Sequence, residues 1–214
     1  MRLFQRTRNR LGNRAFTLLE LFIVLALVLI LLALILPAAL IRQREKSRRI
    51  RCADNIKRTY IASALSMEDS SGGRYAACLY TNETGGWKIA DATNIYIYFQ
   101  VMSNDLHTPD VLHCPADLRR RAAKNFTTDF NGSRISYFLG ADADETMPQM
   151  FLTGDRNLTN GMPLSNGIME ITPQHPAGWT MEMHHGQGNI GLADGSVQQF
   201  SATRLTGTNR LAFP

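Results

Sequence analysis

The side chains best suited to chemistry in this sequence include three cysteines and five histidines. His184 and His185 are adjacent, so on a strand they would point to opposite faces and could not easily share one ion. His113 and Cys114 are also adjacent, whereas a zinc site needs ligand pairs two to four residues apart in two clusters. The spacing therefore argues against zinc and leaves the binding of any other metal unknown.

Acidic residues gather in the segment GADADET, which contains Asp142, Asp144 and Glu145, and Asp155 lies shortly after it. Alternating carboxylates in a loop can hold calcium, although this spacing is not that of an EF-hand. A solvated acidic turn is the interpretation that we favour, with a calcium site as the open alternative.

Catalytic signatures are missing from the sequence, since it contains no nucleophile elbow, phosphate-binding loop or HExxH motif. We therefore predict no catalytic residues and no enzyme activity. In an oxidising compartment, three cysteines predict one disulfide and one free thiol. Cys52–Cys114 is the preferred pair, because it would close a long loop and stabilise the fold by roughly 4 kcal/mol. Cys78 could replace either partner.

The clearest element of the sequence is a long apolar run. Leu21–Leu36 is sixteen consecutive apolar residues, Pro37 interrupts the run, and four more apolar residues come after it. A helix needs roughly 20 such residues to cross the hydrocarbon layer of a membrane, and it satisfies its own backbone hydrogen bonds there. We predict a transmembrane helix over residues 16–41, with a buried helix of a soluble protein as the alternative.

Basic residues flank the apolar run on both sides. Residues 1–15 contain five arginines and no acidic residue, and residues 42–58 contain eight basic and two acidic residues. Residues 59–214 are acidic, with 10 basic and 15 acidic residues. A duplex-binding domain carries positive charge on its folded body, so nucleic acid is not predicted as a partner despite the net charge of +5.

Residues 42–70 are predicted to form an amphipathic neck helix. One apolar stripe that could face a sheet recurs there at helical spacing, formed by Ile50, Ile56, Tyr60, Ile61, Ala64 and Leu65. The basic residues of the neck most simply form a solvated collar near acidic lipid headgroups. Docking on a neighbour's acidic head is the alternative.

Residues 71–214 are predicted to form a head domain of short strands and long loops. Ile95–Met102 fits a strand or a helix equally well, since so short an apolar run has no decisive periodicity. Short strands are predicted at Val111–Cys114, Ser136–Leu139 and Met150–Thr153. The sequence NIGLADGSVQQF predicts a hairpin with a two-residue Asp194-Gly195 turn of type I′, in which Leu192 lies opposite Val197.

The start of the apolar run resembles the type IV prepilin signature. The segment Arg14-Ala15-Phe16-Thr17-Leu18-Leu19-Glu20 has a basic residue, a small residue, an aromatic residue and a carboxylate at the fifth position after Ala15. The resemblance implies that a prepilin peptidase/N-methyltransferase removes the leader 1–15 between Ala15 and Phe16 and methylates the new N-terminus. Ala15 stands where glycine is usual in the family.

Glu20 lies among apolar residues, where an unpaired charge in a membrane costs about 2.5–3.5 kcal/mol or more. After cleavage, the new amino group of Phe16 could pair with Glu20 of the same chain or of a neighbour. In the family, the pairing between neighbours is thought to set the register of assembly. The alternative is a protonated Glu20 that reaches the nearby interface. Pro37 would be residue 22 of the processed chain, where many type IV pilins also have a proline.

The C-terminal part resembles a prepilin-type subfamily with a His-x9-Asp-Gly signature, matched here by His184, Asp194 and Gly195. The resemblance gives His184 no role. The major pseudopilins of type II secretion, which are similar at the N-terminus, bind calcium in their heads. No other cofactor is expected.

Together, the residues and the resemblance predict an α+β, pilin-like fold, with a long N-terminal helix whose second half packs on a small antiparallel sheet. The expected function is that of a bacterial pseudopilin or type IV pilin subunit, which assembles with identical or related subunits into a filament for protein secretion or surface attachment. The helix would cross the inner membrane once, with the N-terminus cytoplasmic and the head extracytoplasmic. The alternative is a non-polymerising bitopic membrane protein whose exposed head binds a ligand.

Overall fold

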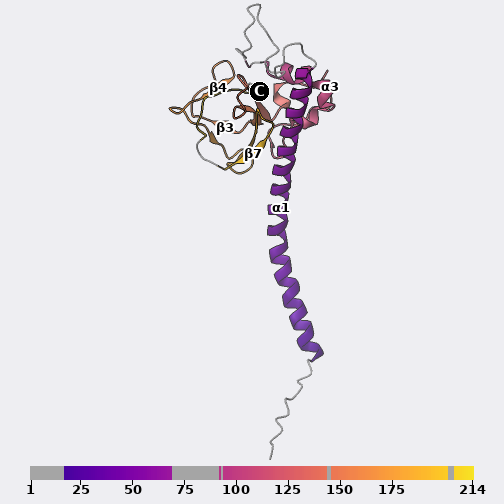
Figure 1. The fold of residues 1–214 in the computed structure, drawn as a ribbon. Coiled ribbons are helices and arrows are strands. Elements are labelled where there is room, and N and C mark those ends of the chain that lie inside the picture. The colour runs from indigo at the N-terminus through magenta and orange to yellow at the C-terminus, as the bar shows by residue number, and fades with distance from the viewer. Residues whose placement is uncertain (1–16, 69–91, 93, 144–145, 202–204) are drawn as a thin grey trace, which may run out of the picture. The chain divides into compact units, whose positions relative to one another are not determined.

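A computed structural model describes residues 17–68, 92, 94–143, 146–201 and 205–214 (Figure 1). The chain divides into two compact units, Met1–Gln43 and Arg44–Pro214. The long helix α1 (Leu18–Glu68) supplies residues to both units.

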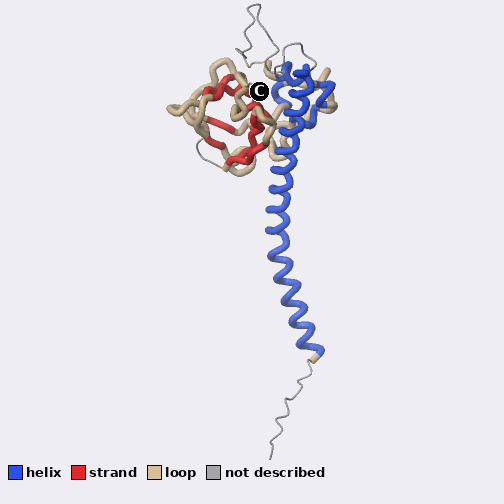
Figure 2. The backbone as a smooth tube through the Cα atoms, in the orientation of Figure 1, coloured by secondary structure: helices blue, strands red, loops and turns tan. Residues whose placement is uncertain are grey.

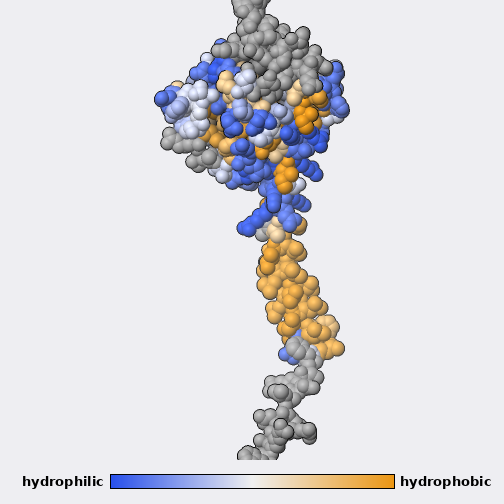
Figure 3. Space-filling model, viewed as in Figure 1, coloured by the Kyte–Doolittle hydropathy of each residue, from blue (hydrophilic) through white to orange (hydrophobic). Residues whose placement is uncertain are grey.

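The first unit contains the apolar part of α1. Leucine and alanine are good helix formers, and the Thr17 hydroxyl accepts a hydrogen bond from the Glu20 backbone N–H (3.2 Å) at the start of the helix. The helix continues through Pro37. None of its most apolar 18-residue segment is buried inside the structure, and Figure 3 shows the continuous apolar surface that this segment exposes. By length and composition, this helix could span a membrane.

The second unit combines the end of α1 with short helices and a sheet, and these helices and strands gather in separate regions (Figure 2). The helical segments after α1 are α2 (Tyr96–Val101), α3 (Ser103–Leu106), η2 (Pro109–Leu112) and η3 (Gly132–Arg134). The strands are β1 (Tyr137–Gly140), β2 (Phe151–Asp155), β3 (Leu158–Thr159), β4 (Ile168–Ile171), β5 (Gly178–Trp179), β6 (Gly188–Leu192), β7 (Val197–Phe200) and β8 (Asn209–Ala212). This arrangement confirms the α+β class.

The main sheet is antiparallel and has six strands in the order β4-β8-β1-β2-β6-β7, while β3 and β5 form a separate pair. Both faces of the central strands are buried. Tyr137 and Leu139 of β1 pack in the same core as Ile56 of α1, whereas Phe138 points to a second core with Ile190 and Leu211. Every residue of β1, β2 and β6 is therefore buried.

The buried stripe of α1 differs from the predicted one. Ile50, Ile61 and Leu65 are about half exposed. The buried positions of this part of the helix are instead Cys52, Ile56, Thr59, Ala62, Ser63 and Ser66. Small and polar side chains fill the stripe because the helix approaches the sheet closely. A Cβ on Gly191 of β6 would lie 2.8 Å from Ile56.

The predicted hairpin exists, but its turn and register were wrong. Hydrogen bonds from the Leu192 N–H to the Ser196 carbonyl (2.9 Å) and from the Gly195 N–H to the Leu192 carbonyl (3.0 Å) enclose a three-residue loop. Gly195 alone in this loop has positive φ (+81°), which is the pattern of a type I turn followed by a left-handed residue. Val197 consequently pairs with Gly191 and not with Leu192.

The other predicted segments have mixed outcomes. The strands at Ser136–Leu139 and Met150–Thr153 are present as β1 and β2. Ile95–Met102 contains the helix α2. The strand at Val111–Cys114 was wrong, because Pro109, whose ring fixes φ, begins the 3-10 turn η2 and carries the chain through Leu112.

Candidate functional site

Four side chains from distant parts of the chain converge inside the second unit. They are Cys52, Cys114, Asp155 and His184, all buried, and one ligand atom from each lies within 4.8 Å of the others. The Cys52 thiol donates to Asp155 Oδ1 (2.7 Å), and Cys114 Sγ lies 3.2 Å from His184 Nε2. His184 Nε2 lies 3.5 Å from Asp155 Oδ2. The described residues thus contain one compact, mixed set of sulfur, nitrogen and oxygen ligands.

Four different elements hold these side chains. Cys52 lies on α1 one turn before Ile56, and Asp155 is the last residue of β2. Cys114 comes after η2 at the start of a turn, in which the Asp117 N–H donates to the Cys114 carbonyl (2.9 Å). His184 lies in the turn between β5 and β6.

The turn that carries His184 is strained. His184, His185 and Gly186 have φ values of 50°, 55° and 75°. The left-handed conformation costs a non-glycine residue of order 1 kcal/mol or more. This turn buries His184, whereas the side chain of His185 is 73% exposed. Strained residues that persist in a fold are often part of a functional site.

Further hydrogen bonds orient the four side chains. Asn189 of β6 donates to Asp155 Oδ2 from its backbone N–H (2.7 Å) and from its side-chain amide (3.0 Å). The Ala116 N–H donates to Cys114 Sγ (3.4 Å), and the Tyr137 hydroxyl lies 3.4 Å from Cys52 Sγ. Each of the two sulfur atoms and the carboxylate therefore has a second partner.

An ion network holds the three non-helical segments together. Arg156, the residue after Asp155, makes a bidentate pair with Asp117 (2.7 and 2.9 Å) and also contacts Glu182 (2.6 Å). Asp117 lies three residues after Cys114, and Glu182 lies two residues before His184. One guanidinium thus links the chain segments that carry three of the four side chains.

Burial shifts the ionisation of the cluster. It raises the pKa of the Cys52 thiol well above its ordinary value, with the charge of Asp155 as a further cause. It also raises the pKa of Asp155 to about 6, against hydrogen bonds from Cys52 and Asn189 that lower it. Burial lowers the pKa of His184 to about 4, and the nearby Arg49 cation adds to this effect. The Cys52 thiol and the His184 imidazole are consequently neutral near pH 7.

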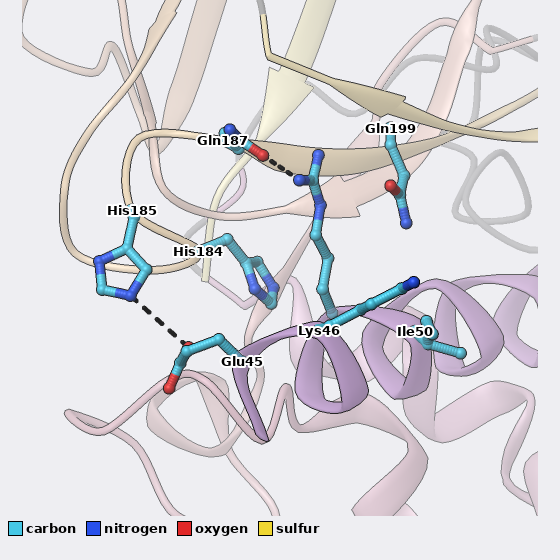
Figure 4. A pocket seen from close by; sticks show the side chains of 8 residues that line it. Glu45, Lys46, Ile50, His184, His185, Gln187 and Gln199 are labelled. Carbon is cyan, nitrogen blue, oxygen red and sulfur yellow. Dashed lines mark hydrogen bonds and ion pairs between the residues drawn. The ribbon is translucent and has the colours of Figure 1, made fainter. Parts of the chain in front are cut away.

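A pocket of about 380 Å³ reaches the cluster at His184 (Figure 4). It is lined by Glu45, Lys46, Arg49, Ile50, His184, His185, Gln187 and Gln199. His185 Nε2 lies 3.7 Å from Glu45, and the Arg49 guanidinium donates to the Gln187 side-chain carbonyl. His184 lines this pocket, but its side chain is only 1% exposed.

The structure separates the residues of the His-x9-Asp-Gly signature into two settings. His184 belongs to the buried cluster, while the exposed Asp194 side chain accepts a hydrogen bond from the Ser196 N–H (2.8 Å) in the hairpin turn. Gly195 lies under the ring of Tyr60, where a Cβ would come within 2.5 Å of ring carbons. The glycine is therefore needed for the packing of α1 on this hairpin.

The predicted processing and assembly residues belong to the first unit. Glu20 and Pro37 lie on α1, and the Glu20 side chain is exposed there. Ala15 and Phe16 lie outside the described residues.

The predicted Cys52–Cys114 disulfide is not formed in this structure: the two cysteines lie close together, but both are free thiols. Cys78 lies outside the described residues. Of the acidic residues that were weighed for calcium, Asp142 pairs with Arg210 (3.0 Å) and Asp155 belongs to the buried cluster. Asp144 and Glu145 lie outside the described residues.

The spacing of histidines and cysteines along the sequence gave no sign of this cluster. Its members are 62, 41 and 29 residues apart along the chain, so no local motif marks them. No protein-family model, curated protein or solved structure matches the chain.

Proposed function

We propose that this protein is a membrane-anchored, pilin-like structural subunit, a pseudopilin or a type IV pilin, that assembles into a filament serving protein secretion or surface attachment. The observation that carries the proposal is the apolar half of α1, which begins inside the prepilin-like sequence. None of its most apolar 18-residue segment is buried inside the structure. So large an exposed apolar surface needs lipid or other apolar helices around it.

The physical basis of assembly is an exchange of neighbours. In the inner membrane, lipid covers the apolar part of α1; in a filament, the same surface packs against the helices of other subunits. The cost of Glu20 in an apolar environment falls when the amino group of a processed Phe16 pairs with it. This pairing selects one axial offset between subunits.

The orientation rests on the resemblance. Both flanks of the apolar segment are basic. The excess of positive charge that marks cytoplasmic loops therefore does not decide which end of the helix faces the cytoplasm. In the family, the peptidase acts at the cytoplasmic face, which places the N-terminus inside and the head outside.

Mass spectrometry of the N-terminus of the protein purified from cell membranes tests the proposal. We expect a chain that begins with N-methyl-Phe16. A chain that retains Met1 would instead favour the non-polymerising membrane protein with a ligand-binding head. A chain that begins near Leu40 would identify an ordinary secreted protein.

The substitution Ala15→Glu tests the cleavage site itself. We expect it to abolish processing, because a large charged side chain replaces the small residue beside the cleaved bond. Asn13→Glu is the control, since it adds the same charge to the leader two residues away and should be processed normally. A processed chain from the Ala15→Glu variant would contradict the assigned site.

A further inference from the structure

We propose that Cys52, Cys114, Asp155 and His184 form a structural Zn²⁺ site that joins α1 to the sheet of the second unit. The inference concerns this unit alone and does not depend on the proposed function. It begins from the convergence of four buried potential ligands, one from each of four chain segments.

All four ligand atoms lie within 4.8 Å of one another, and two of the separations around His184 are close to those of a tetrahedral ion. Zn–S bonds of about 2.3 Å and Zn–N or Zn–O bonds of about 2.0 Å place tetrahedral ligand atoms roughly 3.3–3.8 Å apart. His184 Nε2 lies 3.2 Å from Cys114 Sγ and 3.5 Å from Asp155 Oδ2. Cys52 Sγ and Asp155 Oδ1 are closer, at 2.7 Å, and a small rotation of the carboxylate opens this distance.

The surroundings of the four side chains are those of a ligand set. Metal-bound carboxylates are usually held by hydrogen bonds from a second layer, as Asn189 holds Asp155 with two. The Ala116 N–H points at Cys114 Sγ, which favours the thiolate form that binds metal. The strained turn at His184 and His185 is explained by the same role, since it directs Nε2 of His184 into the cluster.

Charge also favours a cation here. Two thiols and a carboxylate are expensive to ionise when buried, and a divalent ion compensates this cost, while the imidazole binds in its neutral form. Binding releases the two thiol protons, and any proton on Asp155, to water. The bound site then has a net charge of −1, which the Arg49 guanidinium beside the cluster offsets.

The ligand types select zinc among the common ions. Thiolate with imidazole in a tetrahedral arrangement is typical of Zn²⁺, whereas calcium and magnesium prefer six or more oxygen ligands. Four protein ligands leave no open position for a reacting water, so the role is structural. The ion would cross-link α1, the Cys114 turn, β2 and the turn before β6.

Metal analysis of the whole chain, purified in detergent without added reductant, tests the proposal. We expect about one zinc per chain, removable by EDTA and replaceable by Co²⁺ with the intense visible absorption of a tetrahedral thiolate complex. After chelation and denaturation, all three cysteines should react as free thiols. Loss of zinc should lower the melting temperature, and its return should restore it.

Matched variants identify the ligands. Cys52→Ser, Cys114→Ser and His184→Ala should each lower zinc occupancy by about tenfold or more at a fixed zinc concentration. His185→Ala should keep the ion, because His185 is exposed and does not belong to the ligand set. Asp155→Cys completes a Cys₃His set, so this variant should bind zinc at least as tightly and add one more thiolate to the Co²⁺ spectrum.

Three results would overturn the proposal. The first is a single reactive thiol after denaturation, which identifies a disulfide in the purified chain. The second is a chain with three free thiols that binds neither zinc nor cobalt while its circular dichroism shows a folded head. The third is zinc that persists in the Cys52→Ser and Cys114→Ser variants, which places the ion elsewhere.

Discussion

At the scale of single residues, Arg156 makes two ion pairs with mostly buried partners, Asp117 and Glu182. Its partner Asp117 is almost completely buried, and Arg156 itself is 12% exposed. Burial alone would raise the pKa of Asp117, but the hydrogen bonds and charge of Arg156 lower it below its ordinary value, with a smaller contribution from Arg120. Removal of the guanidinium leaves Asp117 and Glu182 close together without their shared cation.

We therefore predict that Arg156→Met lowers the free energy of unfolding by about 3 kcal/mol near pH 7, because the buried carboxylate of Asp117 loses its ion-pair partner. Arg58→Met is the control, since the Arg58–Asp54 pair is exposed and should contribute less than about 0.5 kcal/mol. Denaturant titration of the detergent-solubilised chain, followed by circular dichroism, measures both. Equal losses in the two variants would contradict the role of Arg156.

The same variant has a pH signature. A carboxyl group whose folded pKa is depressed stabilises the fold above its unfolded pKa and loses this contribution as the pH falls through the folded value. The unfolded value for aspartate is about 3.9. Because burial without Arg156 raises the pKa of Asp117, the difference between wild type and Arg156→Met should be largest at neutral pH and begin to shrink already above about pH 4 as the pH falls. A difference that is constant from pH 7 to pH 3 would assign the loss to packing.

At the scale of elements, the position of α1 on the sheet depends on two close contacts with glycines. Ile56 is completely buried against Gly191, whereas Ile50, less than two turns earlier, is 54% exposed. Gly195 and Tyr60 make a second close contact farther along the same helix. The two glycines allow a helix with mostly small buried side chains to approach the strands.

We predict that Ile56→Ala destabilises the second unit by about 2–5 kcal/mol, since it removes a completely buried side chain and leaves a cavity. Ile50→Ala removes the same atoms from an exposed position and should change the free energy of unfolding by less than about 0.5 kcal/mol. The pair is compared by denaturant unfolding of the whole chain. Similar losses at both positions would mean that α1 packs on the sheet through a different face.

At the scale of the whole molecule, the proposed filament depends on Glu20. We predict that Glu20→Ala leaves membrane insertion intact, because it only makes the helix more apolar. Its recovery in sheared filaments should fall about tenfold or more, which corresponds to a lost interaction of at least about 1.4 kcal/mol. Leu29→Ala, in the middle of the same apolar run, is the control and should assemble normally. Normal recovery of the Glu20→Ala variant would refute the pairing with Phe16.

The sequence by itself determined the apolar helix, the α+β class and the existence of the last hairpin. These features depend on local properties, namely an unbroken apolar run, helical composition after it, and an Asp-Gly turn between apolar segments. The buried stripe of α1 could not be obtained from the same properties. Thr59 and Ser63 are buried because the sheet lies close to them. The sequence of a helix alone does not show how closely a sheet will pack against it.

Only the tertiary structure shows that the four residues of the buried cluster lie together. Cys52, Cys114, Asp155 and His184 lie on a helix, a turn, a strand end and a strained turn, and their separations form no repeat. They meet because β2 and β6 pair side by side while α1 crosses them at Gly191. Such contacts between distant residues are set by how the sheet is paired, which no local pattern of residues specifies.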